Sequence, residues 1–471
     1  MTSVLAAGGA SAVAPVWAQL IDLFVAICFV LALKGLSGPK TARNGNLLGA
    51  FGAVVAVLTL FFAYPGMKNL PLIIGAIIVG VVIAFPIARK VKMTSMPQLV
   101  ALFNGVGGGA AALVSIVEYL QAGESESKGI LAATVFTVIV GSVSFTGSIL
   151  TFLKLQEAIT TRPIVIPGGQ YITSLVAIGT IVAGVALVIN PATWLLVVLI
   201  VLSALLGLLL VLPVGGADVP IIISLLNAFT GLSVAASGYV LGNVLLIVAG
   251  TLVGASGTLL TREMAKAMGR PLTNTMFGAF TATAVSASAG GGEDRPVKSA
   301  GPEDVAIMLG YASKVIIVPG YGLAVAQAQH QIRELVDLLN EKGIEVDYAI
   351  HPVAGRMPGH MNVLLAEANV PYEQLKEMDE INPEFSSTDV VMVVGANDVV
   401  NPAAKSDPTA PIYGMPILDV ADAAQVVFLK RSMRPGFAGI ENELLFDPKT
   451  TLLFGDAKDS LTKVVSAVKA M

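Results

Sequence analysis

Two short runs in the second half of the chain combine residue types suited to holding a phosphorylated dinucleotide. Gly320-Tyr321-Gly322 follows an apolar, β-branched run and precedes a helix-forming run. Glycines at such a junction let the backbone approach a pyrophosphate, which the following helix N-terminus favours. Lys430-Arg431-Ser432 places two cations and a hydroxyl after another apolar run, a set suited to a ribose 2′-phosphate. These runs predict a dinucleotide site; the alternative for the second run is a solvated strand end.

The fingerprint at the first run is incomplete. Its third position is Val325 rather than glycine or alanine, so the match alone is weak. After the second expected strand an NAD site usually places Asp or Glu on the ribose, whereas this chain has His351 and then Arg356. The missing acid and the present cation favour a phosphorylated ribose or a pyrophosphate as the partner of Arg356. A surface salt bridge for Arg356, and packing in a turn for His351 and His360, are the alternatives.

A third run, Gly395-Ala396-Asn397-Asp398, also follows an apolar strand. Asn and Asp at a strand end are often simple turn residues. In this position they are also candidates for hydrogen bonds to a nicotinamide carboxamide. Hydride transfer to or from a nicotinamide needs positioning and exclusion of water rather than a side-chain acid or base.

Strands and helices are expected to alternate from about residue 315, which predicts a parallel sheet covered on both faces. Ligands of such sheets bind at the carboxyl ends of the strands, where all of these runs fall. The expected strands are 315–318, 345–350, 390–395, 417–420 and 426–429, and the expected helices run from the first turn to about 339, over 361–368, and from about 460.

Residues 1–270 differ sharply in composition from the rest. They hold 13 of the 28 Lys and Arg but only 7 of the 32 Asp and Glu, so their formal charge is +6, against −10 for residues 271–471. A membrane span needs about 20 mostly apolar residues. About nine stretches qualify: 15–34, 47–64, 71–89, 97–121, 129–154, 171–190, 192–213, 219–240 and 243–261. The expected fold class is a polytopic α-helical membrane domain followed by a soluble α/β Rossmann-like domain.

The placement of Lys and Arg predicts the orientation. The connections after odd-numbered spans hold most of the basic residues, Lys154 among them, whereas the even-numbered connections hold only Lys68 and Lys128. Because cytoplasmic loops carry the excess of Lys and Arg, we expect the N-terminus outside and the C-terminal domain in the cytoplasm. A cleaved signal peptide is the less favoured interpretation of the first stretch, since no basic region precedes it.

A Ser- and Gly-rich run at 286–296 is typical of a flexible linker. It is either a hinge or a passive tether. The expected domains are therefore a transmembrane domain over 1–270, a linker over 271–303 and a nucleotide domain over 304–471.

Few ionisable side chains fall inside the expected spans. Asn104, Ser148 and Asn227 lie nearest to mid-membrane, and Asp218 precedes the eighth span. They either join helix to helix by hydrogen bonds or line a proton path. Gly250-Thr-Leu-Val-Gly254 matches the pattern of close helix packing, which also arises by chance in glycine-rich spans.

Two absences narrow the class of protein. All three histidines lie in the soluble half, so no histidine pair is available to hold a haem between the helices. The single cysteine, Cys28, excludes a disulfide or a cysteine metal site within the chain. We expect neither a metal nor a nucleic acid as a ligand.

With these runs in view, essentially the whole chain resembles the β subunit of the proton-translocating NAD(P) transhydrogenases. The resemblance rests on the runs 318–329, 351–356, 358–368, 395–398 and 428–433. It implies about nine membrane helices ahead of a cytoplasmic NADP(H)-binding domain, and an NAD(H)-binding domain on a separate α subunit in bacterial forms.

The resemblance also implies roles for individual residues. Lys430, Arg431 and Ser432 would bind the 2′-phosphate, and Asn397 and Asp398 would lie near the nicotinamide ribose and ring. Gly320, Gly322 and Arg356 would lie along the pyrophosphate, because this family binds NADP(H) in the reverse of the usual orientation. The implied cofactor-binding set is completed by Tyr321, Val325, Ala354, Gly355, Gly395 and Phe437.

Two positions depart from the family pattern. Some members carry a membrane histidine, tied to proton transfer, where this chain has Asn104. A proton-handling histidine should then come from the partner subunit. Phe437 stands where relatives often have a tyrosine in the lid over the nucleotide, so a hydroxyl hydrogen bond is lost.

The expected function is reversible hydride transfer between NADH and NADP⁺ coupled to proton passage across a bacterial inner membrane. The chain would hold NADP(H) and be active only with the α subunit, as a dimer of αβ units in the lipid bilayer. A nucleotide-gated ion channel or transporter with a regulatory Rossmann domain shares the architecture and is the alternative. Such a domain would more often use an acid-bearing NAD fingerprint.

Overall fold

The computed structural model describes the chain except for residues 1–14, 64–68, 93–94, 123–126, 157, 161–163, 165, 215–217, 268–294, 356–358, 409, 411 and 437. It divides the chain into two compact units. The first comprises Met1–Val91, Gln98–Val214 and Ile222–Thr261, and the second Lys92–Pro97, Gly215–Ile221 and Arg262–Met471. Residues 271–294 of the expected linker lie outside the described residues, as do Arg356 and Phe437.

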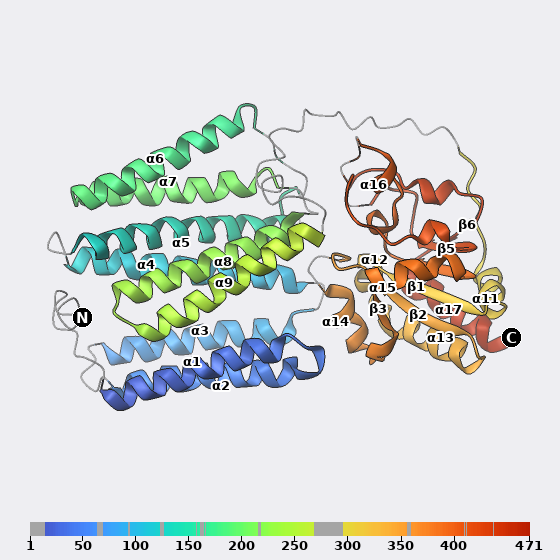
Figure 1. Ribbon diagram of the computed structural model, residues 1–471, viewed down its shortest axis with the longest axis horizontal. Coiled ribbons are helices and arrows are strands. Elements are labelled where there is room, and N and C mark those ends of the chain that lie inside the picture. Colours follow the sequence, from blue (N-terminus) through green and yellow to red (C-terminus); the bar gives the residue numbers. More distant parts are fainter. Residues whose placement is uncertain are drawn as a thin grey trace. The chain divides into compact units, whose positions relative to one another are not determined.

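Long apolar helices form the first unit, and they appear in Figure 1 as rods lying alongside one another. Among the described residues, nine helices are long and apolar enough to cross a membrane, as the sequence predicted. They are α1 (Val16–Leu36), α2 (Pro39–Ala63), α3 (Leu70–Lys90), α4 (Met96–Ala122), α5 (Lys128–Leu155), α6 (Gly169–Ile189), α7 (Thr193–Val211), α8 (Val219–Val240) and α9 (Val244–Ala267).

Glycines bring the backbones of α8 and α9 into close contact. A Cβ placed on Gly250 would lie 2.4 Å from the backbone nitrogen of Ala235, and one on Gly231 would lie 2.4 Å from that of Gly254. Real Cβ atoms do not approach so closely, so the two helices can pack at this distance only because these positions are glycine. The small-residue pattern at 250–254 is therefore a packing site and not a chance match.

Lys154, at the end of α5, binds the end of α7. Its ammonium group donates to the carbonyl oxygens of Val211, Leu212 and Val214 at 3.0, 2.6 and 2.9 Å, and the residue is 1% exposed. The last carbonyls of a helix have no partner within the helix, and a cation there also matches the helix dipole. Lys154, which was expected in the connection after the fifth span, is therefore a buried helix cap.

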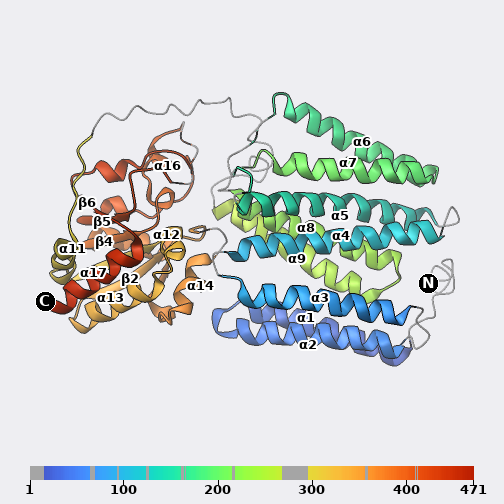
Figure 2. The same ribbon diagram turned by 180° about the vertical axis from the view of Figure 1, so that it is seen from behind.

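The second unit is built on a parallel sheet of six strands in the order β3-β2-β1-β4-β5-β6. Figures 1 and 2 show helices on both faces of this sheet. The strands are β1 (Lys314–Pro319), β2 (Glu345–Ile350), β3 (Leu375–Glu377), β4 (Val390–Val394), β5 (Gln425–Lys430) and β6 (Thr450–Phe454). The helices are α11 (Pro302–Gly310), α12 (Tyr321–Val325), α13 (Gln329–Glu341), α14 (His360–Glu367), α15 (Met378–Ile381), α16 (Ala403–Ser406) and α17 (Ala457–Ala470).

Alternate residues of the strands supply two hydrophobic cores. Along β1, Val315 and Ile317 pack with α11, α13, α14 and α17 on one face, while Ile316 and Val318 pack with α15 and its neighbouring loops on the other. Successive side chains of a strand point to opposite faces. A strand that is apolar throughout, as β1 is, must therefore be covered on both.

Three details of the expected sheet were wrong or missing. The apolar run 417–420 is not a strand: Ile417 and Leu418 are buried in a loop, and the Leu418 N–H donates to the Val399 carbonyl. β3 and β6 were not expected. The helix expected from 321 to about 339 is two helices, because Gln327, at φ +51°, adopts a left-handed conformation after α12.

Residues 295–303 are the described part of the expected linker. Ser299 forms a parallel bridge to Leu452 of β6, and the Leu452 N–H donates to the Lys298 carbonyl at 2.7 Å. α11 begins at Pro302. This end of the segment is therefore bound to the edge of the sheet.

Candidate functional site

The carboxyl ends of β1 and β4 meet at the middle of the sheet. These strands are neighbours, but from β1 the chain continues to β2 on one side and from β4 to β5 on the other. Such a switch point is where open α/β sheets bind ligands. The turn at 320–322 and the run 395–398 both lie there, as their strand ends predicted.

Three glycines allow the two turns to touch. A Cβ placed on Gly322 would lie 2.6 Å from the Cα of Gly395, and one on Gly320 would lie 2.4 Å from the backbone of Ala396. Gly395 has a φ of +71°, which a residue with a Cβ rarely adopts. The glycines therefore serve backbone-to-backbone packing between β1 and β4.

This contact uses backbone donors at the start of α12. The N–H of Gly322 donates to the carbonyl of Gly395 at 2.9 Å, and the N–H of Leu323 donates to that of Gly320 at 3.1 Å. α12 itself has only five residues. The turn thus has the predicted glycines, but these two N–H groups face protein carbonyls.

Lys430, the last residue of β5, reaches across to the end of β4. Its Nζ donates to the Asn397 Oδ1 and to the Arg434 carbonyl, each at 3.2 Å. The Asn397 amide in turn donates to the Asp398 Oδ1 at 2.9 Å. Burial lowers the pKa of Lys430, although the charge of Asp398 opposes that shift. One hydrogen-bonded group thus contains three of the predicted site residues.

The loop after β5 folds over the same group. The Ala438 N–H donates to the Asp398 Oδ2 at 2.9 Å. A Cβ on Gly436 would lie 2.4 Å from the Asp398 Oδ1 and 2.5 Å from the Asn397 Nδ2. Arg431 and Ser432 of this loop are exposed. Side chains for a phosphate are therefore available beside a well-anchored Asn–Asp–Lys group.

His351 ties the loop after β2 to a distant segment. Its Nδ1 accepts from the Val353 N–H at 3.2 Å, so its Nε2 carries the proton and donates to the Pro416 carbonyl at 2.8 Å. The ring is 1% exposed, and burial lowers the pKa of His351 to about 4. A neutral, doubly bonded imidazole of this kind supports the predicted alternative of packing in a turn.

The rest of the loop after β2 is packed around His360. Ala354 is buried, and a Cβ on Gly355, whose φ is +101°, would lie 2.5 Å from the His360 Nδ1. The Tyr321 ring meets the His360 ring edge-on, with centroids 6.0 Å apart. Val325 ends α12 and is 45% exposed, so it does not make the close helix-to-strand contact of a third fingerprint glycine.

Two buried asparagines that the sequence analysis did not single out hold the end of β4. Asn442 Nδ2 donates to the Asn397 carbonyl at 3.0 Å, and Asn401 Nδ2 donates to the Glu441 carbonyl at 3.0 Å. Both residues are at most 1% exposed. Asn401 precedes a proline, a typical turn signal; nothing local marks Asn442.

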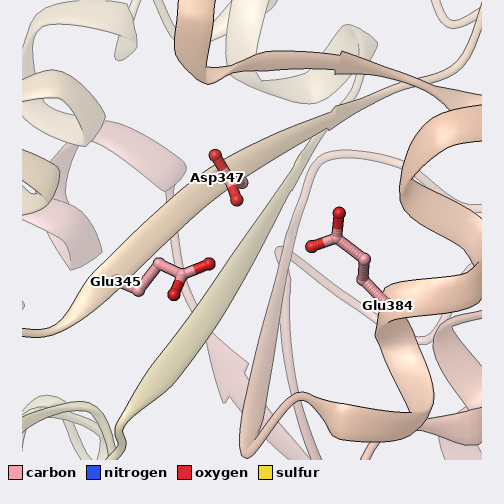
Figure 3. A group of neighbouring side chains, drawn as sticks. All are labelled: Glu345, Asp347 and Glu384. Atoms are coloured by element: carbon pink, nitrogen blue, oxygen red, sulfur yellow. The ribbon is translucent and has the colours of Figure 1, made fainter.

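Three carboxylates gather toward the amino ends of β1 and β2, at the opposite edge from the site (Figure 3). Glu345 and Asp347 lie on β2, and Glu384 lies on a neighbouring helical turn. The Lys314 Nζ donates to Glu345 at 2.8 Å and to Glu384 at 2.5 Å. Burial raises the pKa of Asp347, against the charges of Lys376 and Lys314. Lys314 thus supplies the cation for this group.

A hollow of about 420 Å³ also lies in the second unit, away from the predicted residues. It is lined by Asp379, Asn382, Pro383, Ser386, Asp419 and Asp422. Three carboxylates would repel the phosphates of a nucleotide. The charges therefore favour the carboxyl edge of β1, β4 and β5 as the nucleotide site.

A buried polar cluster joins three helices of the first unit. Asn104 of α4 donates through its Nδ2 to the hydroxyls of Ser148 at 2.9 Å and Ser144 at 3.4 Å, both on α5. Ser144 is 2.5 Å from the Thr230 hydroxyl of α8 and donates to the Leu226 carbonyl at 3.0 Å. The structure therefore brings two of the predicted proton-path residues, Asn104 and Ser148, together.

The remaining predicted proton-path residues are placed differently. Asn227 is half-buried on α8, between Leu226 and Ala228, and its side chain is not part of the hydrogen-bonded cluster of Asn104, Ser144, Ser148 and Thr230. Asp218 lies directly before α8. The Asn104 Oδ1 is buried and has no hydrogen-bond partner among the described residues. Since a buried polar atom without a partner is unfavourable, this oxygen is a place for a water molecule.

Two comparisons with known proteins point to the same family over nearly the whole chain. A family model described as the NAD(P) transhydrogenase beta subunit matches residues 18–467. Two curated relatives, both from Rhodospirillum rubrum and both called NAD(P) transhydrogenase subunit beta, are 48% identical to this chain over 451 residues. The match covers 94% of this chain and 97% of each relative.

Proposed function

The chain belongs to the family of NAD(P) transhydrogenase beta subunits, and on that premise we propose that it binds NADP(H) at the carboxyl edge of its sheet. The observation that carries this proposal is the Lys430–Asn397–Asp398 group at the end of β4, beside the exposed Arg431. Two adjacent cations suit a ribose 2′-phosphate. The end of β2 carries a buried histidine and no carboxylate for the 2′-hydroxyl of NAD.

The predicted residues at the ends of β4 and β5 then have separate roles. Arg431 and Ser432 hold the 2′-phosphate together with Lys430. Asn397 and Asp398, kept in place by Asn442 and the loop after β5, orient the nicotinamide end. The bound NADP(H) supplies the hydride-accepting or hydride-donating ring, and this chain supplies position and shielding from water.

The reaction we propose is reversible hydride transfer between NADH and NADP⁺, coupled to proton passage. NAD(H) would be held by an α subunit, and a dimer of αβ units would lie in a bacterial inner membrane. Residues 1–270 would form the membrane domain and 304–471 the cytoplasmic domain, with the N-terminus outside.

We also propose that Asn104, Ser148, Asp218 and Asn227 lie on the proton path. The buried, unbonded Asn104 Oδ1 and the adjoining hydroxyls support a hydrated passage. Amides and hydroxyls do not titrate near neutral pH. The group that takes up and releases the proton beside Asn104 should therefore come from the partner subunit.

The decisive experiment is co-expression of this chain with a candidate α subunit in membrane vesicles. Hydride transfer from NADH to NADP⁺ is measured with and without a proton gradient, and we expect the gradient to change the rate severalfold. A rate that does not respond to the gradient contradicts the coupling. Binding of NADPH and NADH to the full chain is measured separately, and equal affinities contradict the phosphate site.

A further inference from the structure

Arg295 is the first described residue after the segment 268–294. Its side chain contacts both ends of the short stretch 441–446. Its guanidinium binds Glu441 at 3.1 Å and Glu443 at 3.0 Å. It also lies over the Phe446 ring, 4.0 Å from the centroid. One planar side chain thus holds three residues of the stretch 441–446.

The residue between the two glutamates is Asn442, which faces the candidate site. Its Nδ2 donates to the Asn397 carbonyl, and its Oδ1 accepts from the Leu444 N–H, both at 3.0 Å. The Glu441 carbonyl accepts from the buried Asn401 amide. The stretch that Arg295 holds is therefore the one that holds the end of β4.

The Asn397 side chain continues the connection. Its Oδ1 accepts from Lys430, and its Nδ2 donates to Asp398. Arg295 touches none of these three residues in the described contacts, but two hydrogen-bonded steps join it to them. Arg295 also follows α9, which ends at Ala267, by 28 positions in the chain (295 − 267).

We propose that Arg295 is a positioning residue for the nucleotide site. It fixes the stretch 441–446 so that Asn442 holds Asn397, and through Asn397 it sets the position of Lys430. This inference rests on the proposed function. It assigns a role to a residue that lies outside the candidate site and follows α9 in the chain. A guanidinium is needed because its planar fork can bind both glutamates while its face covers Phe446.

The test uses the full chain in detergent and compares Arg295→Gln with Lys469→Gln as a matched control. Lys469, on the final helix α17, also forms an exposed ion pair, and its partner is Glu334 of α13. Exposed pairs contribute little to stability, so both variants should unfold at the temperature of the unaltered protein. We expect Arg295→Gln to weaken NADPH binding about fivefold and Lys469→Gln to leave it unchanged.

Two further readouts separate positioning from a general loss of structure. Hydrogen–deuterium exchange of the backbone amides in 441–446 and of Ala438 should quicken in Arg295→Gln alone. Combining Arg295→Glu with Glu443→Arg should restore part of the NADPH affinity that either change alone removes. Unchanged affinity and unchanged exchange in Arg295→Gln overturn the inference. If the unaltered chain does not prefer NADPH to NADH, the proposed function itself fails.

Discussion

Lys430 and Arg431 are adjacent cations that are held very differently. Lys430 is half-buried and binds Asn397 and the Arg434 carbonyl, whereas Arg431 is exposed. We expect Arg431→Gln to lower NADPH affinity about 10- to 100-fold, the worth of a charged hydrogen bond, and to leave NADH affinity alone. Lys430→Gln should weaken the binding of both nucleotides, because Asn397 loses its hydrogen bond from the Lys430 ammonium group. Titration calorimetry on each variant checks this; equal losses of NADPH and NADH in Arg431→Gln would count against the phosphate assignment.

His351 makes the stability of the second unit depend on pH. Its pKa is about 4 in the folded protein and about 6.5 when unfolded. Between these values the unfolded chain binds a proton that the native chain does not, so the free energy of unfolding falls as the pH falls from about 6.5 to 4. The loss is on the order of 3 kcal/mol.

His351→Gln provides the check, because glutamine can still donate to the Pro416 carbonyl but does not titrate. Calorimetric unfolding of the full chain between pH 4 and 7.5 should show a shallower pH dependence in the variant. The variant should gain no stability at pH 7, where the native imidazole is already neutral. A pH dependence identical to that of the unaltered protein would show that another group is responsible.

At the level of single residues, the sequence predicted which candidate residues lie at one edge of the sheet, but not the residues that hold them there. Lys430, Asn397 and Asp398 could be placed at this edge because they follow apolar strands whose carboxyl ends lie together. The contacts of Asn442 and Arg295 could not be predicted, since they span 45 positions of the chain for Asn442 and 146 and 148 positions for Arg295. Lys154 carries a charge that the sequence places at a loop and the fold places at a helix end.

At the level of elements, the contact between the turns after β1 and β4 needs a glycine at 395 for two reasons: its positive φ and the absence of room for a Cβ. Gly395 and Gly414 both have positive φ, at +71° and +80°, but only Gly395 lies against another backbone. We expect Gly414→Ala to cost about 1 kcal/mol of stability from the backbone alone. Gly395→Ala should cost clearly more and abolish NADPH binding. Thermal unfolding and NADPH binding of the two variants decide this, and equal effects would mean that the close contact is unimportant.

The elements that the sequence predicted well are those with a strong pattern. The nine membrane-length helices among the described residues are long apolar runs, and β1, β2, β4 and β5 are apolar runs beside turn residues. The run 417–420 is also largely apolar, but among the described residues it pairs with no strand. Its apolar side chains are buried in a loop instead. β3 is missed because it has three residues, two of them charged, and the break at Gln327 depends on one left-handed residue.

For the molecule as a whole, the proposed coupling predicts that the response to a proton gradient can be lost while NADPH binding is kept. We expect Asn104→Leu to remove most of the response of hydride transfer to a proton gradient, because it deletes the amide that joins α4 to Ser148. NADPH affinity should stay within about twofold, since the change lies in the other compact unit. Vesicles containing the α subunit provide the assay.

Thr180→Val is the control for that experiment. The Thr180 hydroxyl is buried in α6 but bonds only to the Val176 carbonyl of its own helix. Its removal should leave the response to the gradient intact. A full response in Asn104→Leu would exclude the cluster of Asn104, Ser144, Ser148 and Thr230 from the proton path.

The short helix α12 and the Gly322–Gly395 hydrogen bond have a consequence for ionic strength. A long helix with free N-terminal amides binds a phosphate through fixed dipoles close to the ligand. Here the amides of Gly322 and Leu323 are already bonded within the protein, so in the proposed site the exposed Arg431 and the partly exposed Lys430 would supply much of the attraction for the anion. Attraction by exposed charges is screened over about 10 Å at 0.1 M salt. The hold of this chain on its nucleotide should therefore loosen as the salt of its surroundings rises.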